Sequence, residues 1–87
     1  MKQYIYHTDP GHGWFAVKRS ELVKLNIADK ITPYSYTKGQ TVYLEEDLDA
    51  DTFFKAYELA YGCKPQYRQT YRKNTPIRNY EHYSLDK

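Results

Sequence analysis

Two imidazoles and a carboxylate stand within six positions near the start of the chain, at His7, Asp9 and His12. Zinc, manganese and iron accept such ligands, which would support a metal-assisted hydrolase. The amides of Gly11 and Gly13 would then be the donors to an oxyanion. However, the spacing H-x-D-x-x-H matches no diagnostic metal motif, and turns favour Asp and Gly for backbone reasons alone. The alternative hypothesis is structural, with Asp9 as a turn cap and His12 as an exposed loop residue.

The C-terminal segment 64–87 carries a second set of residues with binding chemistry. Arginines bind phosphates or carboxylates, and tyrosines stack on bases or anchor protein interfaces. Three alternatives follow: an interface with a protein, a direct contact with nucleic acid, or a solvated edge strand protected by its charges. The candidate binding residues are Trp14, Tyr67, Arg68, Tyr71, Arg72, Lys73, Arg78 and Tyr80.

An acidic run at residues 45–51 places five carboxylates in seven positions. Such a run could bind a cation or imitate a phosphate backbone, but it lacks the glycine and the final glutamate of a calcium-binding loop. Negative charge is favourable at a helix N-terminus, so we expect the run to form the solvated start of the following helix. Cys63 stands beside Lys64 without an identifiable base, and we expect it to be a structural thiol.

Length and composition indicate one small domain. The chain has 87 residues, 11 of them Tyr, and a single cysteine, which excludes an intrachain disulfide and indicates a reducing compartment. We find no secretory signal and no apolar stretch long enough to span a bilayer. We therefore expect a cytoplasmic protein without a membrane partner.

Charge is distributed unevenly along the chain. Residues 1–63 hold seven Lys and Arg against nine Asp and Glu, whereas residues 64–87 hold six against two. This divides the chain into an α+β body, 1–63, and a basic, Tyr/Arg-rich segment, 64–87, of the same domain. The segment could be a strand, an arm or a stretch that orders only on binding.

The strands that must position these residues are indicated by short runs of branched and aromatic residues. Such runs stand at 3–7 and 14–18, and again at 34–36 and 41–44. Each pair flanks a glycine-containing connection, which predicts two antiparallel hairpins.

Two helices are expected between and after these hairpins. Ser20 has the side chain of an N-cap for a short helix that ends near Asn26. A longer helix begins after a cap at Asp49 or Asp51, and Gly62 ends it in the left-handed conformation. Its apolar residues recur at helical spacing: Phe53, Phe54, Tyr57, Ala60 and Tyr61. The predicted fold is a small single α+β domain in which antiparallel β-hairpins pack against two helices.

Several stretches resemble a family of small uncharacterised proteins carried by phages, plasmids and their bacterial hosts. The similar stretches are HTDPGHGW at 7–14, IADKI at 27–31, YSY at 34–36, VYLEED at 42–47 and PIRNY at 76–80. The likeness covers most of the chain but brings no activity, cofactor or functional residues with it. It implies a context, because accessory proteins of mobile elements include stoichiometric inhibitors of host defence and modulators of host machinery.

These observations together predict a non-enzymatic binding protein of a mobile element. We expect it to contact a host protein or protein complex stoichiometrically, as an inhibitor of host defence or a modulator of host machinery. Two alternatives stay open: a metal-assisted hydrolase that uses His7, Asp9 and His12, and a direct binder of DNA or RNA through segment 64–87. We expect no cofactor, apart from a divalent metal ion in the hydrolase alternative.

Overall fold

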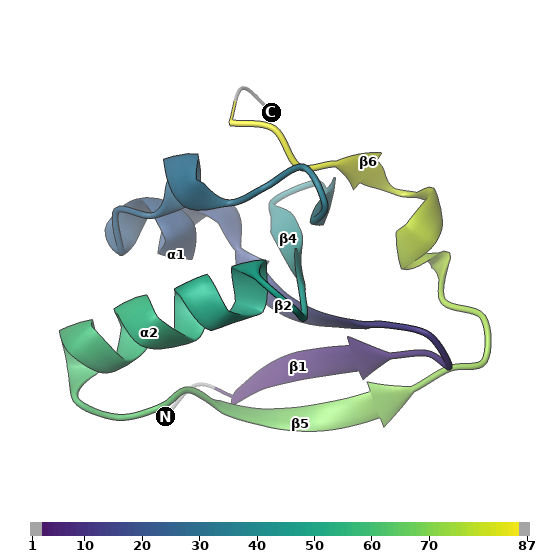
Figure 1. The fold of residues 1–87 in the computed structure, drawn as a ribbon, viewed down its shortest axis with the longest axis horizontal. Coiled ribbons are helices and arrows are strands. Elements are labelled where there is room, and N and C mark those ends of the chain that lie inside the picture. The colour runs from purple at the N-terminus through teal and green to yellow at the C-terminus, as the bar shows by residue number, and fades with distance from the viewer. Residues whose placement is uncertain (1–2, 86–87) are drawn as a thin grey trace.

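A six-stranded sheet forms the centre of the computed structural model, which describes residues 3–85, and both α-helices lie on one of its faces (Figure 1). In chain order the elements are β1 Gln3–Thr8, β2 Gly13–Lys18, α1 Arg19–Lys24, the 3-10 helix η1 Ala28–Lys30, β3 Tyr36–Lys38, β4 Thr41–Glu45, α2 Asp49–Tyr61, β5 Gln66–Tyr71, the 3-10 helix η2 Pro76–Asn79 and β6 Glu81–His82. The strand order is β5-β1-β2-β4-β3-β6. This architecture confirms the predicted α+β fold class. Within residues 3–85, neither helix has the length and apolar character needed to cross a membrane.

Both predicted hairpins form, but the bounds predicted for one strand are wrong: β3 covers Tyr36–Lys38 and shares only Tyr36 with the predicted run at 34–36, because Thr37 and Lys38 pair with β4. In the first, His7 of β1 lies opposite Trp14 of β2, and in the second Tyr36 of β3 lies opposite Tyr43 of β4. Gly39 in the second connection has φ +60°, a conformation that side-chain-bearing residues disfavour. The two hairpins are joined by antiparallel pairing of β2 with β4.

The C-terminal segment supplies both edges of the sheet. β5 pairs in parallel with β1 along its whole length at one edge, and β6 pairs with β3 at the other. Between these strands the chain rises along the right of Figure 1 through the short helical turn η2. Of the forms expected for this segment, residues 66–71 adopt a strand, which is largely exposed at the sheet edge.

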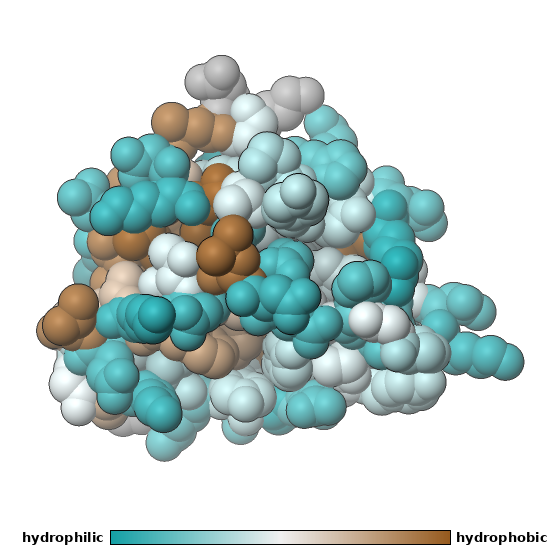
Figure 2. Space-filling model, in the orientation of Figure 1, coloured by the Kyte–Doolittle hydropathy of each residue, from teal (hydrophilic) through white to brown (hydrophobic). Residues whose placement is uncertain are grey.

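The core lies between the sheet and the two helices. Phe15 of β2 and Phe53 of α2 are fully buried with ring centroids 5.7 Å apart, and Leu44 of β4 is fully buried in the same cluster. Burial of one such side chain stabilises the fold by about 1.5–3 kcal/mol. Figure 2 shows apolar side chains gathered over the helices at the left of the view, whereas hydrophilic ones predominate at the right.

The predicted N-caps are wrong, and the predicted C-cap is confirmed. α1 begins one residue before Ser20, because β2 runs directly into the helix and leaves no connecting residue to act as a side-chain cap. Neither Asp49 nor Asp51 caps α2, whose N-cap position is occupied by Leu48 without a side-chain hydrogen bond. Gly62 ends α2 with φ +75°, in the left-handed region.

Asp49 is instead the centre of a buried polar network. Its fully buried carboxylate accepts hydrogen bonds from the hydroxyls of Ser35 at 2.5 Å and Thr32 at 2.8 Å, and from the Thr32 amide at 3.1 Å. The Ser35 hydroxyl in turn accepts a bond from the Glu45 amide at 3.0 Å. The expectation of a solvated acidic run is therefore wrong for Asp49, which needs its carboxylate inside to satisfy these donors, although Asp47 is exposed.

Cys63 lies in the turn that follows α2. Its side chain is exposed, because the helix has already ended at Gly62 and the chain is turning towards β5. The expectation that Cys63 is a structural thiol stays a prediction, and its side chain takes no part in the buried core cluster.

Candidate functional site

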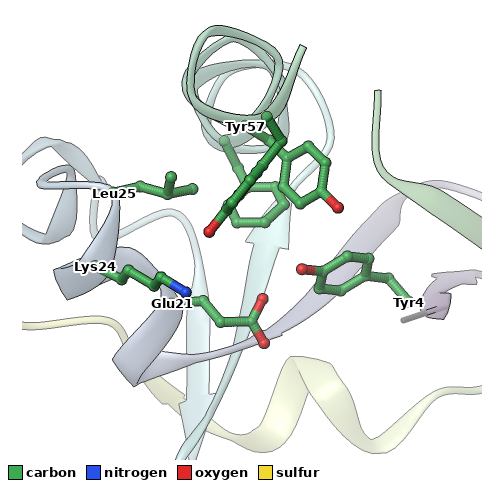
Figure 3. A pocket seen from close by; sticks show the side chains of 7 residues that line it. Tyr4, Glu21, Lys24, Leu25 and Tyr57 are labelled. Carbon is green, nitrogen blue, oxygen red and sulfur yellow. The ribbon is translucent and has the colours of Figure 1, made fainter. Parts of the chain in front are cut away.

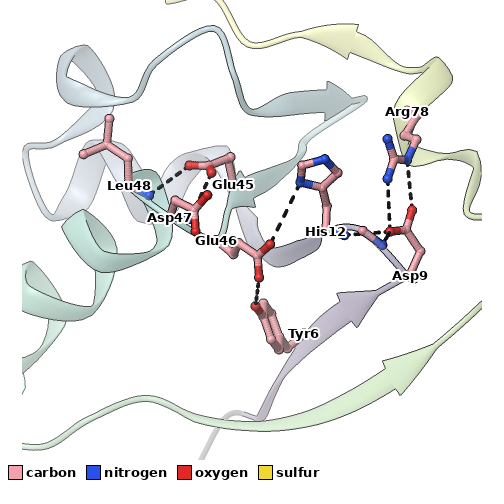
Figure 4. A network of polar contacts seen from close by, with 9 residues as sticks. Tyr6, Asp9, His12, Glu45, Glu46, Asp47, Leu48 and Arg78 are labelled. Carbon is pink, nitrogen blue, oxygen red and sulfur yellow. Dashed lines mark hydrogen bonds and ion pairs between the residues drawn. The ribbon is translucent and has the colours of Figure 1, made fainter.

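Asp9 is fully engaged within the fold. Its Oδ1 accepts hydrogen bonds from the amides of Gly11 at 2.9 Å and His12 at 2.8 Å, which makes it the turn cap of the structural hypothesis. The Arg78 guanidinium donates to the same carboxylate, with Nε–Oδ2 at 2.9 Å and Nη2–Oδ1 at 3.1 Å (Figure 4). The Arg78 guanidinium, aided by the two amides, holds the pKa of Asp9 well below its usual range.

The two histidines of the turn region have different neighbours. The His7 ring lies 5.7 Å from the Tyr43 ring, whereas the His12 ring lies 6.0 Å from that of Trp14. Among residues 3–85, no three His, Cys, Asp or Glu side chains are grouped as ligands for a metal ion. The structure therefore does not bring His7, Asp9 and His12 together as a ligand set.

The β1–β2 hairpin is also tied to the acidic run. The Tyr6 hydroxyl donates to Glu46 Oε2 at 3.0 Å, and His12 Nδ1 lies 4.0 Å from Glu46 Oε1 (Figure 4). Burial and this bond to Glu46 raise the pKa of Tyr6 to about 12. The Glu45 carboxylate accepts two bonds of 2.9 Å from backbone amides at the start of α2. Glu45 and Glu46 are thus engaged within the fold.

Strand alternation divides the residues of the basic segment between two faces of the sheet. The Tyr67 ring faces the helices, 6.2 Å from the Phe54 ring. Arg68, one position later, and Arg72 line a hollow on the opposite face. Because successive strand residues point to opposite faces, Tyr71 shares the face of Tyr67. The expectation that these tyrosines and arginines form one contact surface is therefore wrong.

Trp14 and Arg78, also expected at the contact surface, take part in packing. Trp14 is 3% exposed, and the Arg78 guanidinium carbon lies 5.5 Å from the centre of its ring. The surface prediction is therefore wrong for the Trp14 ring, which is covered from outside. Tyr80 is half-buried with its ring 5.3 Å from the Tyr43 ring, and Lys73 is exposed.

A groove runs along the sheet face that the helices leave uncovered, and we call it the open-face groove. It consists of two adjoining hollows of about 270 Å³ each, which share Ile5, His7 and Tyr43 as their common floor. β5 borders one side, and the segment around η2 forms the facing wall. The other side chains that matter for its chemistry are those of Ala16, Lys18, Arg68, Arg72, Thr75 and Tyr80.

The cations of the open-face groove have no acidic neighbour within it. No Asp or Glu occurs among the described residues that line the two hollows. Within residues 3–85, the side chains of Arg68 and Arg72 form no ion pair or hydrogen bond. Burial, followed by the charges of Arg72 and Arg68, lowers the pKa of His7 and so favours the neutral imidazole. The groove therefore presents a positive potential.

One polar atom in the groove wall is unsatisfied by the protein. Thr75 Oγ1 is buried without a hydrogen-bond partner among the described residues. A buried hydroxyl in this state costs free energy unless water or a ligand bonds to it.

The sequence analysis did not identify Ala16 and Tyr43 as site residues. The sheet register aligns Ile5, Ala16 and Tyr43 across β1, β2 and β4. Because Ala16 is the smallest of the three, it leaves space between its larger neighbours. The sequence contains one indication of this site, the small residue Ala16 within the alternating run of β2. It does not identify the site, because the residues beside Ala16 in the sheet come from distant positions in the chain.

A different hollow lies between α1 and α2 (Figure 3). Tyr4, Glu21, Lys24, Leu25 and Tyr57 are among the residues that line it. Burial and a hydrogen bond to Glu21 raise the pKa of Tyr4 well above its usual range. The hollow contains one acid and one base, so it lacks the excess charge that distinguishes the open-face groove.

Comparisons with known proteins find no match. No protein-family model matches the chain, and neither the curated proteins nor the solved structures include one with significant similarity. The candidate site is therefore defined by its own geometry and charge.

Proposed function

We propose that the protein is a small non-enzymatic binding module of a mobile element, which makes stoichiometric contact with an acidic component of the host. Its contact surface is the open-face groove. The contact would inhibit host defence or modulate host machinery. The mobile-element context rests on the resemblance of the stretches at 7–14, 27–31, 34–36, 42–47 and 76–80 to proteins of phages and plasmids.

The observation that carries this proposal is the uncompensated charge of the open-face groove. Arg68, Arg72 and Lys18 line it, and none of its described lining residues is acidic. Hydrogen bonds between a guanidinium and an anionic group are about twice as strong as neutral ones. Half-buried aromatic side chains beside arginines are also typical of the centre of binding surfaces.

The chemistry of the groove supports binding in preference to catalysis. His7 is the one imidazole in its described lining, and the hydroxyl oxygen of Thr70 lies 3.4 Å from its Nδ1. A general base that activates a hydroxyl is usually oriented by a third group, such as a carboxylate. The described groove lining contains no carboxylate for this purpose.

A pull-down from bacterial host lysate tests the proposal. We expect the wild-type protein to retain a partner that is lost with the double variant Arg68→Glu/Arg72→Glu. The matched control is Lys24→Glu/Lys30→Glu, which changes the net charge equally at exposed positions of α1 and η1. Retention of every partner by the arginine variant would overturn the proposed surface.

A further inference from the structure

We infer that the open-face groove binds single-stranded nucleic acid, with phosphates at Arg68 and Arg72 and an unstacked base against Tyr43. This inference rests on the proposed function, because it names the class of acidic component that the groove contacts. Its support comes from two properties of the groove: cations that are not paired with a carboxylate, and half-buried aromatic rings on its floor.

The phosphate contacts come from the β5 side of the groove. Arg68 and Arg72 are exposed, and within residues 3–85 neither guanidinium is committed to a carboxylate. Each guanidinium can therefore donate two parallel hydrogen bonds to one phosphate. Lys18 lines the other hollow and extends the positive charge along the groove. A chain of phosphates complements such a track of separate cations.

The base contact comes from the rings on the groove floor. Tyr43 is half-buried between His7, with ring centroids 5.7 Å apart, and Tyr80, at 5.3 Å. The interplanar angles of 62° and 48° show that neither neighbour covers the Tyr43 ring in a parallel stack. The neighbouring Ala16 has a small side chain, which leaves space above this part of the groove floor. A planar base can therefore enter and stack on Tyr43, whichever of the four bases it is.

The recessed position of these rings favours a single strand over a duplex. In a duplex the bases are already stacked on one another, so a ring on the floor of a groove does not reach a base face. An acidic protein segment would satisfy the arginines, but its carboxylates would leave the rings without a matched contact.

Fluorescence anisotropy with three labelled probes tests this inference on the full chain. The probes are oligodeoxythymidine of about 12 nucleotides, the same strand annealed to oligodeoxyadenosine, and an oligoglutamate peptide. We expect the single strand to bind most tightly. The slope of log affinity against log salt is negative, and replacement of both cations in Arg68→Gln/Arg72→Gln should reduce its magnitude by about 1.4, because two phosphate contacts are lost. Lys24→Gln/Lys30→Gln is the charge-matched control and should leave the slope unchanged.

Two variants of the groove floor separate ring stacking from charge. Tyr43→Ala should weaken binding of the single strand by about 5- to 150-fold with little change in the salt slope. Ala16→Leu fills the floor without altering charge and should weaken binding as well. Circular dichroism and urea unfolding identify any variant that has lost its fold, in which case Tyr43→Leu replaces Tyr43→Ala.

The outcomes distinguish this inference from the function on which it rests. Absence of single-strand binding at low salt, together with a pull-down partner that still depends on Arg68 and Arg72, overturns the nucleic-acid inference and keeps the proposed function with a protein partner. Tighter binding of oligoglutamate than of the single strand would also overturn the nucleic-acid inference and keep the proposed function with a protein partner. If neither assay depends on the two arginines, both the inference and the proposed function are wrong.

Discussion

The guanidinium of Arg78 holds the carboxylate of Asp9 at two points, with Nε–Oδ2 at 2.9 Å and Nη2–Oδ1 at 3.1 Å. The two residues are 69 positions apart, and their contact joins the β1–β2 turn to η2. The Trp14 ring lies beneath the same guanidinium. Since η2 contributes to the wall of the open-face groove, this ion pair also positions the wall.

Removal of this contact should loosen the groove wall. We expect Arg78→Ala to increase the rate of amide hydrogen exchange in η2, where the Tyr80 amide donates to the Ile77 carbonyl at 3.0 Å. Exchange within α2 should stay as in the wild type. Arg68→Ala removes an arginine that lacks such a contact and is the control. Equal protection of η2 in Arg78→Ala and the wild type would contradict the role given to Arg78.

Asp9 should make stability fall in acid. Because Arg78 and the turn amides lower its folded-state pKa below the reference value of 3.8, its stabilising effect is complete above that value and declines as pH falls below it. Urea unfolding should therefore show the wild type more stable than Asp9→Asn at neutral pH. The difference should shrink below about pH 4, as the carboxylate becomes protonated. A difference that is independent of pH would show that the charge of Asp9 is not responsible.

Loss of the buried carboxylate of Asp49 should destabilise the fold. Asp49→Ala leaves the hydroxyls of Ser35 and Thr32 without their acceptor, and each unsatisfied buried group costs about 1–3 kcal/mol. Asp51→Ala is the control in the same helical turn, because its exposed pair with Lys55 at 3.0 Å contributes only about 0.3–0.5 kcal/mol. The free energies of unfolding in urea compare the two variants, and equal losses would contradict the network.

The end of α2 should depend on the left-handed backbone of Gly62. Its φ of +75° disfavours any residue with a Cβ, although no atom lies within 4 Å of where that Cβ would stand. We therefore expect Gly62→Ala to lower the free energy of unfolding by roughly 1 kcal/mol through backbone strain alone. Gly62→Asn should cost less, because Asn tolerates this region better. Equal stability of the alanine variant and the wild type would contradict the prediction.

The protonation of His7 should report on an anion in the open-face groove. His7 faces Arg68 of β5, Arg72 directly after β5, Tyr43 of β4 and Tyr80 of the groove wall, and burial and the two arginines lower its pKa below 6.5. A bound phosphate would favour the imidazolium and raise this pKa, so affinity for the oligonucleotide should increase as pH falls through the range in which the bound imidazole becomes protonated. NMR titration of the imidazole measures the shift, and in His7→Gln this increase in affinity should be absent.

Local signals in the sequence predict most of the elements. Alternation at 3–7 and 14–18 and helical spacing from Phe53 to Tyr61 are properties of neighbouring residues, so the hairpin and α2 were predictable. The parallel pairing of β5 with β1 brings together Gln3 and Gln66, which have no local relationship. To predict this pairing one must know which strand has an unpaired edge, and that depends on the arrangement of the whole sheet.

The open-face groove was less predictable than the elements around it. Its floor joins Ile5, His7 and Tyr43, whose proximity follows from the order of the strands. Adjacent Tyr67 and Arg68 indicate one surface if segment 64–87 is an irregular arm, whereas in a strand they point to opposite faces. The sequence indicates the Arg/Tyr chemistry of segment 64–87, but it does not show which of these side chains lie on the same face of the sheet.

The placement of β5 and β6 has a consequence for synthesis of the protein on the ribosome. A nascent chain that has emerged only as far as Cys63 contains β1, β2, β4 and β3, but neither strand that borders them in the finished sheet. Until residues 66–82 have left the ribosome, the main-chain donors and acceptors of β1 and β3 remain open to pairing with other chains. Slow translation or premature termination near this point should therefore produce aggregates instead of a smaller folded protein.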